Sequence, residues 1–166
     1  GTDDWYAMQL LSQLLSQGKS SRFNKEIVEK QQKGLAVGAF MIPNEDPGVA
    51  FMYGITNAGV KPEELEKSML EEVEKVKTAL ISDEEYQKLM NQAENDFVSQ
   101  NQRVSGIAEN LATYYTYFRN ADLINTELEK YTKITKEDLK RVANKYLTKE
   151  NRLVVYYLPK SQQKKG

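Results

Sequence analysis

Residues 10–37 read LLSQLLSQGKSSRFNKEIVEKQQKGLAV, and this stretch decides the fold. Its leucines belong to an apolar stripe at helical spacing over residues 4–16, so the pattern predicts a first helix there. Gly18 is the residue type that favours a left-handed helix end, and it predicts where this helix stops. Ser20 and Ser21 offer side-chain oxygens to cap a second, shorter helix, which is predicted to end near residue 29.

The chain changes from helical to extended character at Gly34. Residues 35–42 and 49–56 are short apolar runs, and the sequence NEDPG between them, at residues 44–48, is rich in turn-forming residues. This pattern predicts an antiparallel hairpin. Both faces of each run are apolar, whereas a hairpin with one solvated face alternates apolar and polar residues. Two explanations are open: helices cover both faces, or a strand is missing and the second face meets something outside this chain.

Helical periodicity begins again near residue 61. Pro62 suits the first turn of a helix, because proline needs no hydrogen-bond partner for its nitrogen there. This helix is predicted to bury one face, formed by Leu65, Met69, Val73, Val76 and Leu80. Ser82 and Glu85 have the spacing of a capping box and predict a long helix that ends near residue 102.

Shorter helices and a strand are predicted to complete the chain. The helices cover about residues 104–118 and 123–131 and a last segment that Thr135 caps. The last helix is predicted to bury Leu139, Val142, Ala143 and Tyr146. Residues 153–158 are apolar and β-prone and predict a third strand, and residues 160–166 form a polar tail. Residues 1–166 are therefore predicted to form one α+β domain, with a small antiparallel sheet packed against several helices.

The composition limits the chemistry that this chain can perform. Lys and Arg number 23 against 24 Asp and Glu, and this balance gives no electrostatic reason to expect nucleic acid or a membrane as partner. The chain has no cysteine and no histidine, which excludes disulfides, thiolate or imidazole metal ligands and a histidine base. Carboxylates, Lys, Tyr and Ser/Thr remain, so we expect no autonomous hydrolase.

Two motifs of this sequence resemble the pitrilysin/insulinase/mitochondrial-processing-peptidase family of zinc metallopeptidases. The first motif combines Gly18, the Ser-Ser-Arg-Phe sequence at 20–23 and the Gly-Leu-Ala sequence at 34–36. The second is similar to the family's closing helix and strand and combines ITKEDL at 134–139, VANKYL at 142–147, Asn151 and residues 153–157. Their matching order and spacing extend the resemblance over nearly the whole chain.

The resemblance implies where a metal would be bound in an active relative. Family members repeat an α+β unit, and the units enclose a substrate chamber. The active unit carries His-x-x-Glu-His on its first helix, with a distal Glu as third zinc ligand. Here the helix over residues 4–16 corresponds to the motif helix, and its polar residues are Gln9, Ser12 and Gln13. The helix from Pro62 corresponds to the helix of the distal ligand, and its glutamates have no second set of ligands with which to bind a metal. The chain therefore resembles the family's inactive C-terminal-type domain, without the strand that usually begins a unit.

The resemblance also gives candidate substrate-binding residues. In many family members the silent unit contributes an Arg and a Tyr, seven residues apart, that hold the substrate backbone near the zinc. Aligned on Gly34, these places fall at Lys30 and Val37, which keep a cation but lose the planar guanidinium and the phenol. Lys30 and Arg22 are the candidates. The alternatives are a solvated charge for Lys30 and, for Arg22, hydrogen bonds to carbonyls that brace the loop–helix junction.

An aromatic cluster needs a separate explanation. Its members are Tyr114, Tyr115, Tyr117 and Phe118. A base-stacking platform requires a basic surface, which the net charge of this chain does not supply. We expect these side chains to pack between helices instead, with their hydroxyls at the rim.

These observations lead us to expect a non-catalytic C-terminal domain of a zinc-dependent peptidase, forming part of the chamber wall and of the surface that binds polypeptides. The hairpin of residues 35–56 would receive substrate as an added strand. The expected partners are another unit of the family, in the same parent chain or a partner subunit, and a polypeptide substrate. We expect no cofactor in this chain and zinc in the parent or partner unit. The alternatives are a structural or protein-interaction subunit of a family member that has lost peptidase activity, and an unrelated helical binding module.

Overall fold

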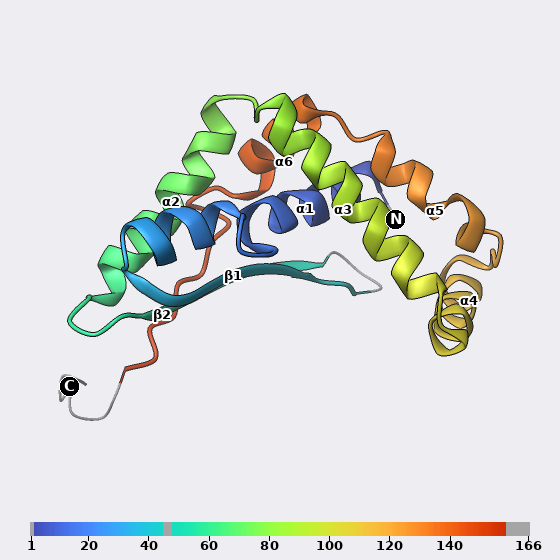
Figure 1. Ribbon diagram of the computed structural model, residues 1–166, viewed down its shortest axis with the longest axis horizontal. Helices are drawn as coiled ribbons and strands as arrows, with labels where there is room; N and C mark the ends of the chain where they lie inside the picture. The colour runs from blue at the N-terminus through green and yellow to red at the C-terminus, as the bar shows by residue number, and fades with distance from the viewer. Residues whose placement is uncertain (1, 45–47, 159–166) are drawn as a thin grey trace.

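The computed structural model describes residues 2–44 and 48–158 (Figure 1). Its elements are, in order, α1 (Asp3–Ser16), the π-helix η1 (Phe23–Lys30), β1 (Gly34–Ile42), β2 (Val49–Thr56), α2 (Pro62–Thr78), α3 (Asp83–Asn101), α4 (Val104–Phe118), α5 (Leu123–Thr132) and α6 (Lys136–Tyr146). This is the predicted α+β architecture. The centre of the predicted turn, residues 45–47, and the predicted polar tail, residues 160–166, lie outside the described residues.

Helix α1 forms the centre of the core. The side chain of Thr2 caps its first turn by accepting a hydrogen bond from the backbone N–H of Trp5. Its apolar stripe is almost fully buried and contains Tyr6, Ala7, Met8, Leu10, Leu11, Leu14 and Leu15. Gly18 follows the helix with a φ of +79°, which confirms the predicted left-handed residue. The helix touches β1, α3, α5, α6 and η1, so it organises most of the domain around itself.

The short helix η1 is a π-helix rather than the ordinary α-helix that the sequence pattern predicts. At its end, the N–H of Gln31 donates to the carbonyl of Glu26, five residues earlier, at 3.0 Å. The predicted capping by Ser20 and Ser21 is wrong: the N-cap residue is Arg22, and it makes no side-chain capping bond. The reason is conformational, because Arg22 is already helical and side-chain capping requires an extended N-cap residue. Phe23 and Ile27 are fully buried and anchor η1 to the core.

The strands β1 and β2 form an antiparallel two-stranded sheet, as predicted. Phe40 lies opposite Phe51 in its register, and an irregularity between Gly34 and Ala36 marks the start of the pairing. The inner face packs against the core through Val37, Ala39, Met41 and Met52. Ser16 of α1 adds a direct link, because its hydroxyl donates to the carbonyl of Ala39 in β1 at 2.7 Å.

In Figure 1, α1, α2, α3, α5 and α6 lie above this sheet and α4 lies beyond the turn end of the hairpin, so no described helix covers the lower face of the sheet. The explanation that helices cover both faces of the hairpin is therefore wrong for the described part of the chain. The predicted third strand is also wrong, since residues 152–158 are neither strand nor helix. The physical reason is that a β-prone sequence becomes a strand only when its backbone finds a partner to pair with.

Helix α2 buries the predicted residues except for one. Leu65, Met69, Val73 and Val76 are at most 9% exposed, but Leu80 is 45% exposed. Helix α2 ends at Thr78, so Leu80 no longer follows the helical period, and Ile81 is buried in its place. The capping box at the start of α3 is confirmed, with hydrogen bonds in both directions between Ser82 and Glu85.

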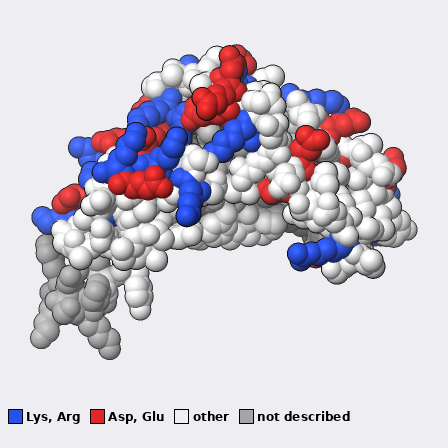
Figure 2. Space-filling model, in the orientation of Figure 1, with Lys and Arg blue, Asp and Glu red and all other residues white. Residues whose placement is uncertain are grey.

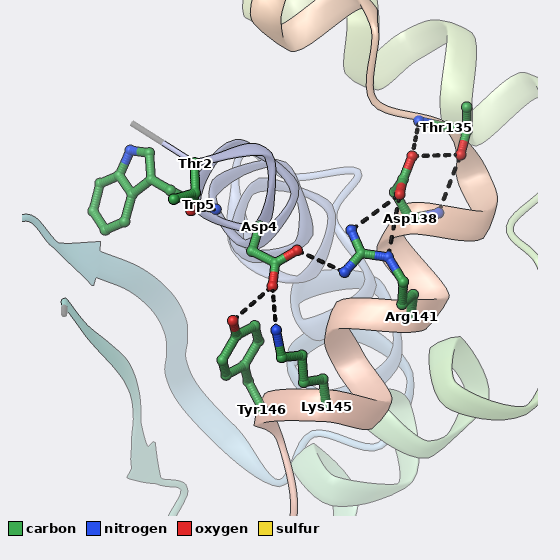
Figure 3. Close-up of polar contacts among 8 residues, drawn as sticks. All are labelled: Thr2, Asp4, Trp5, Thr135, Asp138, Arg141, Lys145 and Tyr146. Atoms are coloured by element: carbon green, nitrogen blue, oxygen red, sulfur yellow. Dashed lines mark hydrogen bonds and ion pairs between the residues drawn. The ribbon is translucent and has the colours of Figure 1, made fainter.

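Helix α6 is fastened to the start of α1 by a network around Asp4 (Figure 3). The carboxylate of Asp4 accepts hydrogen bonds from Arg141 at 2.6 Å, Lys145 at 2.8 Å and the hydroxyl of Tyr146 at 2.6 Å. These bonds, led by the one from Lys145, hold the pKa of the Asp4 carboxyl well below its usual range. Arg141 also pairs with Asp138. The predicted cap by Thr135 is confirmed, because its hydroxyl accepts a hydrogen bond from the N–H of Asp138, and the Asp138 side chain completes a capping box that the sequence analysis did not predict.

The apolar face of α6 is as predicted, with Leu139, Val142 and Ala143 fully buried and Tyr146 partly buried against the core. Helix α6 therefore reaches the core through apolar contacts and reaches α1 through the Asp4 network. Within residues 2–44 and 48–158, no helix is both long enough and apolar enough to cross a bilayer.

Candidate functional site

The outer face of the hairpin is the largest uncovered apolar feature of the sheet. It carries Phe40, Ile42, Val49, Phe51, Tyr53 and Ile55, which are 37–55% exposed. Figure 2 shows that charged side chains gather over the helices, while the lower surface formed around the hairpin is almost free of them. Contiguous apolar patches of this kind on a soluble protein mark interaction sites. We call these six residues the outer face.

Aromatic rings form the centre of the outer face. The rings of Phe40 and Phe51 stack with their centroids 5.6 Å apart, and Tyr53 lies edge-on to Phe40 at 6.3 Å. The Tyr53 ring extends over Gly38 on the neighbouring strand, where any β-carbon would overlap it. The face therefore offers flat π surfaces and apolar side chains and is suited to binding apolar groups rather than ions.

Helix α4 is a second uncovered apolar region. It has no fully buried residue, and Tyr115, Tyr117 and Phe118 are 47–61% exposed. The prediction that the aromatic cluster packs between helices is therefore wrong for these three residues. Helix α4 contacts only its chain neighbours α3 and α5 among the elements with substantial contacts, so it extends from the core rather than entering it. Tyr114 alone of the cluster is partly buried, and burial raises the pKa of its phenol.

The place where the resemblance puts zinc ligands holds an internally bonded cluster instead. Gln9 accepts a hydrogen bond from the hydroxyl of Tyr131, and the hydroxyl of Tyr6 donates to Glu127. Lys130 completes the cluster with a 3.0 Å contact to Glu127. Burial raises the pKa of both Tyr6 and Tyr131, so neither phenol acts as a base near neutral pH.

The other polar groups that α1 presents at this place, Ser12 and Gln13, supply no carboxylate, thiolate or imidazole ligand. The hydroxyl of Ser12 donates to the carbonyl of Gln9, and the side-chain oxygen of Gln13 is buried without a hydrogen-bond partner among the described residues. Across residues 2–44 and 48–158, no group of three or more Asp, Glu, His or Cys side chains is placed to hold a metal ion. The described chain thus offers no built metal centre.

Arg22 makes a bidentate ion pair with Glu85 of α3, with its Nε and Nη2 atoms at 2.9 and 3.0 Å from the two carboxylate oxygens. Burial acts to raise the pKa of Glu85, but the hydrogen bonds and charge of Arg22 outweigh it and lower that pKa. Arg22 therefore braces the η1 junction, through a carboxylate rather than through the carbonyls that the sequence suggested. A cavity of about 30 Å³ beside this pair is lined by Gln13, Ser21 and Lys88 among others, and it has room for about one water molecule.

Lys30 lies at the other end of η1 and pairs with Glu26 at 2.6 Å. This bond raises the pKa of Lys30, which is therefore a cation near neutral pH. Val37, the place of the family's tyrosine, packs against the core on the inner face of β1. The structure does not bring Arg22 and Lys30 together, since they lie at opposite ends of η1.

The sequence predicted the hairpin of residues 35–56 as a substrate surface, but it named no residue of the outer face, and it did not predict α4 as an exposed surface. The signal for the outer face was present in β1 and β2, where apolar residues occupy both faces instead of alternating with polar ones. The signal for α4 was misleading, because an apolar helix is more often buried than exposed.

This chain is similar in sequence to known proteins. A family model described as the peptidase M16 inactive domain matches residues 1–93 of this chain. The zinc protease PqqE of Helicobacter pylori is 29% identical over 156 residues, which make up 94% of this chain and 35% of that protein. This chain therefore spans about a third of the length of that relative.

Solved structures share the fold. A protease from Helicobacter pylori superposes with a TM-score of 0.79 at 28% identity, over 89% of this chain and 35% of that one. A structure described as the inactive peptidase domain of a proposed zinc protease from Bordetella parapertussis has a TM-score of 0.83 at 19% identity. That match covers 96% of this chain and 86% of the Bordetella chain.

Proposed function

This chain belongs to the peptidase M16 inactive domain family, and on that premise we propose that it helps a zinc-dependent peptidase to hold polypeptide substrates. In this role it is the non-catalytic C-terminal domain of a longer parental protein and forms part of the wall of a substrate chamber. The zinc ion belongs to another unit, in the same parental chain or in a partner subunit. That unit and an unfolded polypeptide are the two partners of this chain.

The outer face is the observation that carries this proposal. Its stacked Phe40 and Phe51 and the neighbouring Tyr53 give an uncharged apolar surface that no described helix covers. Extended polypeptides bind to such surfaces through apolar side chains, and they also pair with exposed strand edges through their backbone. A surface without charge accepts many sequences, which suits a protein that holds unfolded chains.

Arg22 and Lys30 enter the proposal differently. Lys30 is two-thirds exposed at its side chain and keeps a cation where the family has a substrate-binding arginine. A carbonyl or carboxylate of a polypeptide can therefore contact the Lys30 ammonium group without any rearrangement of the core. Arg22 is only 17% exposed and is already engaged by Glu85, so its contribution to substrate binding is indirect, through the position of η1.

The loss of the family's Arg–Tyr pair favours a second candidate function. Val37 packs against the core and supplies no hydroxyl, and Lys30 supplies no bidentate donor. On this alternative the chain is a structural or protein-interaction subunit of a family member without peptidase activity. The sequence of the parental protein outside this chain separates the two, because the peptidase requires a His-x-x-Glu-His helix in another unit or in a partner.

The experiment that tests the proposal uses the full-length parental protein and an unfolded, fluorescently labelled polypeptide. We expect cleavage that a zinc chelator stops. We also expect a Phe40→Ser, Phe51→Ser variant to raise KM about tenfold or more with a smaller change in kcat, because the lost surface binds substrate rather than reacting with it. A Lys149→Ser, Glu150→Ser variant, on the exposed turn after α6, is the control. Absence of cleavage favours the structural alternative, and an unchanged KM in the face variant overturns the binding role.

A further inference from the structure

A small polar cavity lies where three segments of the chain meet. Gln13 near the end of α1, Ser21 in the segment before η1 and Glu85 in the first turn of α3 all line it. Its volume is about 30 Å³. Only two of its lining residues, Leu14 and Leu89, are apolar, so the walls supply hydrogen-bonding groups on most sides.

Two buried polar atoms at this cavity have no hydrogen-bond partner among the described residues. They are the hydroxyl oxygen of Ser21 and the side-chain oxygen Oε1 of Gln13. Ser21 is only 4% exposed, so bulk solvent does not hydrate its hydroxyl group. Buried polar groups of native proteins are hydrogen-bonded as a rule, because an unpaired group has lost its bonds to water without a replacement. Both atoms therefore require a partner that fits into the cavity.

The charges around the cavity favour a neutral partner. Arg22 and Glu85 neutralise each other in their bidentate ion pair. The ammonium group of Lys88, which donates to the hydroxyl of Ser20, disfavours a metal cation. The amide oxygen of Gln13 and the carboxylate of Glu85 disfavour an anion. A small neutral molecule that both donates and accepts hydrogen bonds satisfies all of these groups.

From these observations we propose that the cavity is a binding site for one ordered water molecule, which donates a hydrogen bond to Oε1 of Gln13 and forms another with the hydroxyl of Ser21. The volume of about 30 Å³ exceeds the ~10–15 Å³ that one water molecule requires. A water that bridges two protein groups is nearly as favourable in enthalpy as a direct hydrogen bond. It joins α1 to the segment before η1.

The water site gives each residue of the Ser-Ser-Arg sequence at 20–22 a separate role. Ser20 accepts a hydrogen bond from Lys88, and Arg22 pairs with Glu85, so both residues fasten the segment to α3. Ser21 lies between them and fastens the same segment to α1 through the water. This site is distinct from the outer face, so the inference goes beyond the proposed function and does not depend on it.

Diffraction from crystals of the full-length parental protein tests the site directly. We expect one peak of electron density at about 2.7–3.2 Å from both Oγ of Ser21 and Oε1 of Gln13. A cavity without density, or a direct hydrogen bond between Ser21 and Gln13, overturns the inference. Crystals soaked in rubidium bromide distinguish water from an ion. Water gives no anomalous signal, whereas an anomalous peak of rubidium or bromide in the cavity identifies an ion and overturns the inference.

A double-mutant cycle in the full-length protein tests whether Gln13 and Ser21 bind the same molecule. Gln13→Met and Ser21→Ala each remove one polar partner of the water and should each lower the thermal midpoint. No direct hydrogen bond joins the two residues in the described chain. A shared water therefore predicts that the double variant loses less than the sum of the two single losses. Additive losses overturn the inference.

Ser20→Ala supplies the matched control for this cycle. Ser20 also lines the cavity, but its hydroxyl is already bonded to Lys88. The losses of Gln13→Met and Ser20→Ala are therefore expected to add. If this pair couples as strongly as Gln13 and Ser21, the coupling comes from packing around the cavity, and the inference is wrong. The diffraction test needs no variant, so it decides the question even if a substitution prevents folding.

Discussion

Replacing Asp4 by Asn tests the network that fixes α1 against α6. The Asp4 side chain is 20% exposed and receives hydrogen bonds from Arg141, Lys145 and Tyr146. Hydrogen bonds to a charged group contribute about 1.5–3 kcal/mol when sheltered, whereas exposed ion pairs contribute about 0–1 kcal/mol. Arg141 and Lys145 are about half exposed, so solvent screens their interaction with Asp4 and reduces its contribution to stability. We therefore expect Asp4→Asn to lower the free energy of unfolding by about 2 kcal/mol at pH 7.

The pH dependence of this loss identifies its electrostatic origin. The pKa of Asp4 is depressed in the folded chain, so its stabilisation is complete above the unfolded pKa of about 3.9 and is lost as the pH falls below it. Between pH 7 and pH 3 the difference between the wild-type chain and Asp4→Asn should shrink by about 1 kcal/mol. Urea unfolding followed by circular dichroism measures both values.

Asp3→Asn is the matched control, since Asp3 is also in the first turn of α1 and has the same interaction with the helix dipole. We expect it to cost about 0.5 kcal/mol. Tyr146→Phe removes one donor of the network and should couple to Asp4→Asn in a double-mutant cycle. Two results would refute the stabilising role of the network. One is an equal loss of unfolding free energy in Asp3→Asn and Asp4→Asn, and the other is an Asp4→Asn effect that is the same at pH 3 and pH 7.

Variants at three further places test the outer face, the η1 junction and the cap of α3. The Phe40→Ser, Phe51→Ser variant of this chain should lose less than about 2 kcal/mol in urea unfolding, because both rings are about half exposed, and a larger loss would mean that the face is part of the core. Arg22→Lys keeps the charge but removes the bidentate contact with Glu85. The thermal midpoint of this variant should fall by an amount equivalent to about 1 kcal/mol, and an unchanged midpoint would show that the ion pair does not contribute to stability. Ser82→Ala removes the cap of α3 and should cost about 1 kcal/mol by the same measurement, with full recovery in Ser82→Thr.

Most of the elements follow from local sequence signals. Neighbouring residues alone determine the capping box at Ser82, the Thr135 cap, the turn-rich stretch after β1 and the stripe of α1. Local sequence patterns therefore identify them. The lack of imidazole metal ligands is also read directly from the sequence, because no histidine occurs in the chain. These features need no knowledge of distant contacts.

The errors share a different cause. Residues 153–158 and the aromatics of α4 have sequences that suit a strand and a buried helix, but pairing and burial depend on a partner element. Leu80 was misplaced because the end of α2 at Thr78 is not marked by a glycine or proline. The sequence of residues 23–30 predicts a helix, but it carries no signal that separates a π-helix from an α-helix. The sequence showed that β1 and β2 are apolar on both faces. Only the three-dimensional arrangement of the helices shows which of the two faces is uncovered.

The most direct test of the inactive-domain account is incubation of this purified chain with zinc and an unfolded polypeptide, with and without a chelator. The account predicts no cleavage and no stoichiometric zinc after dialysis, because the chain has no histidine and its described residues have no group of side chains placed to hold a metal. Chelator-sensitive cleavage by the pure chain would contradict it.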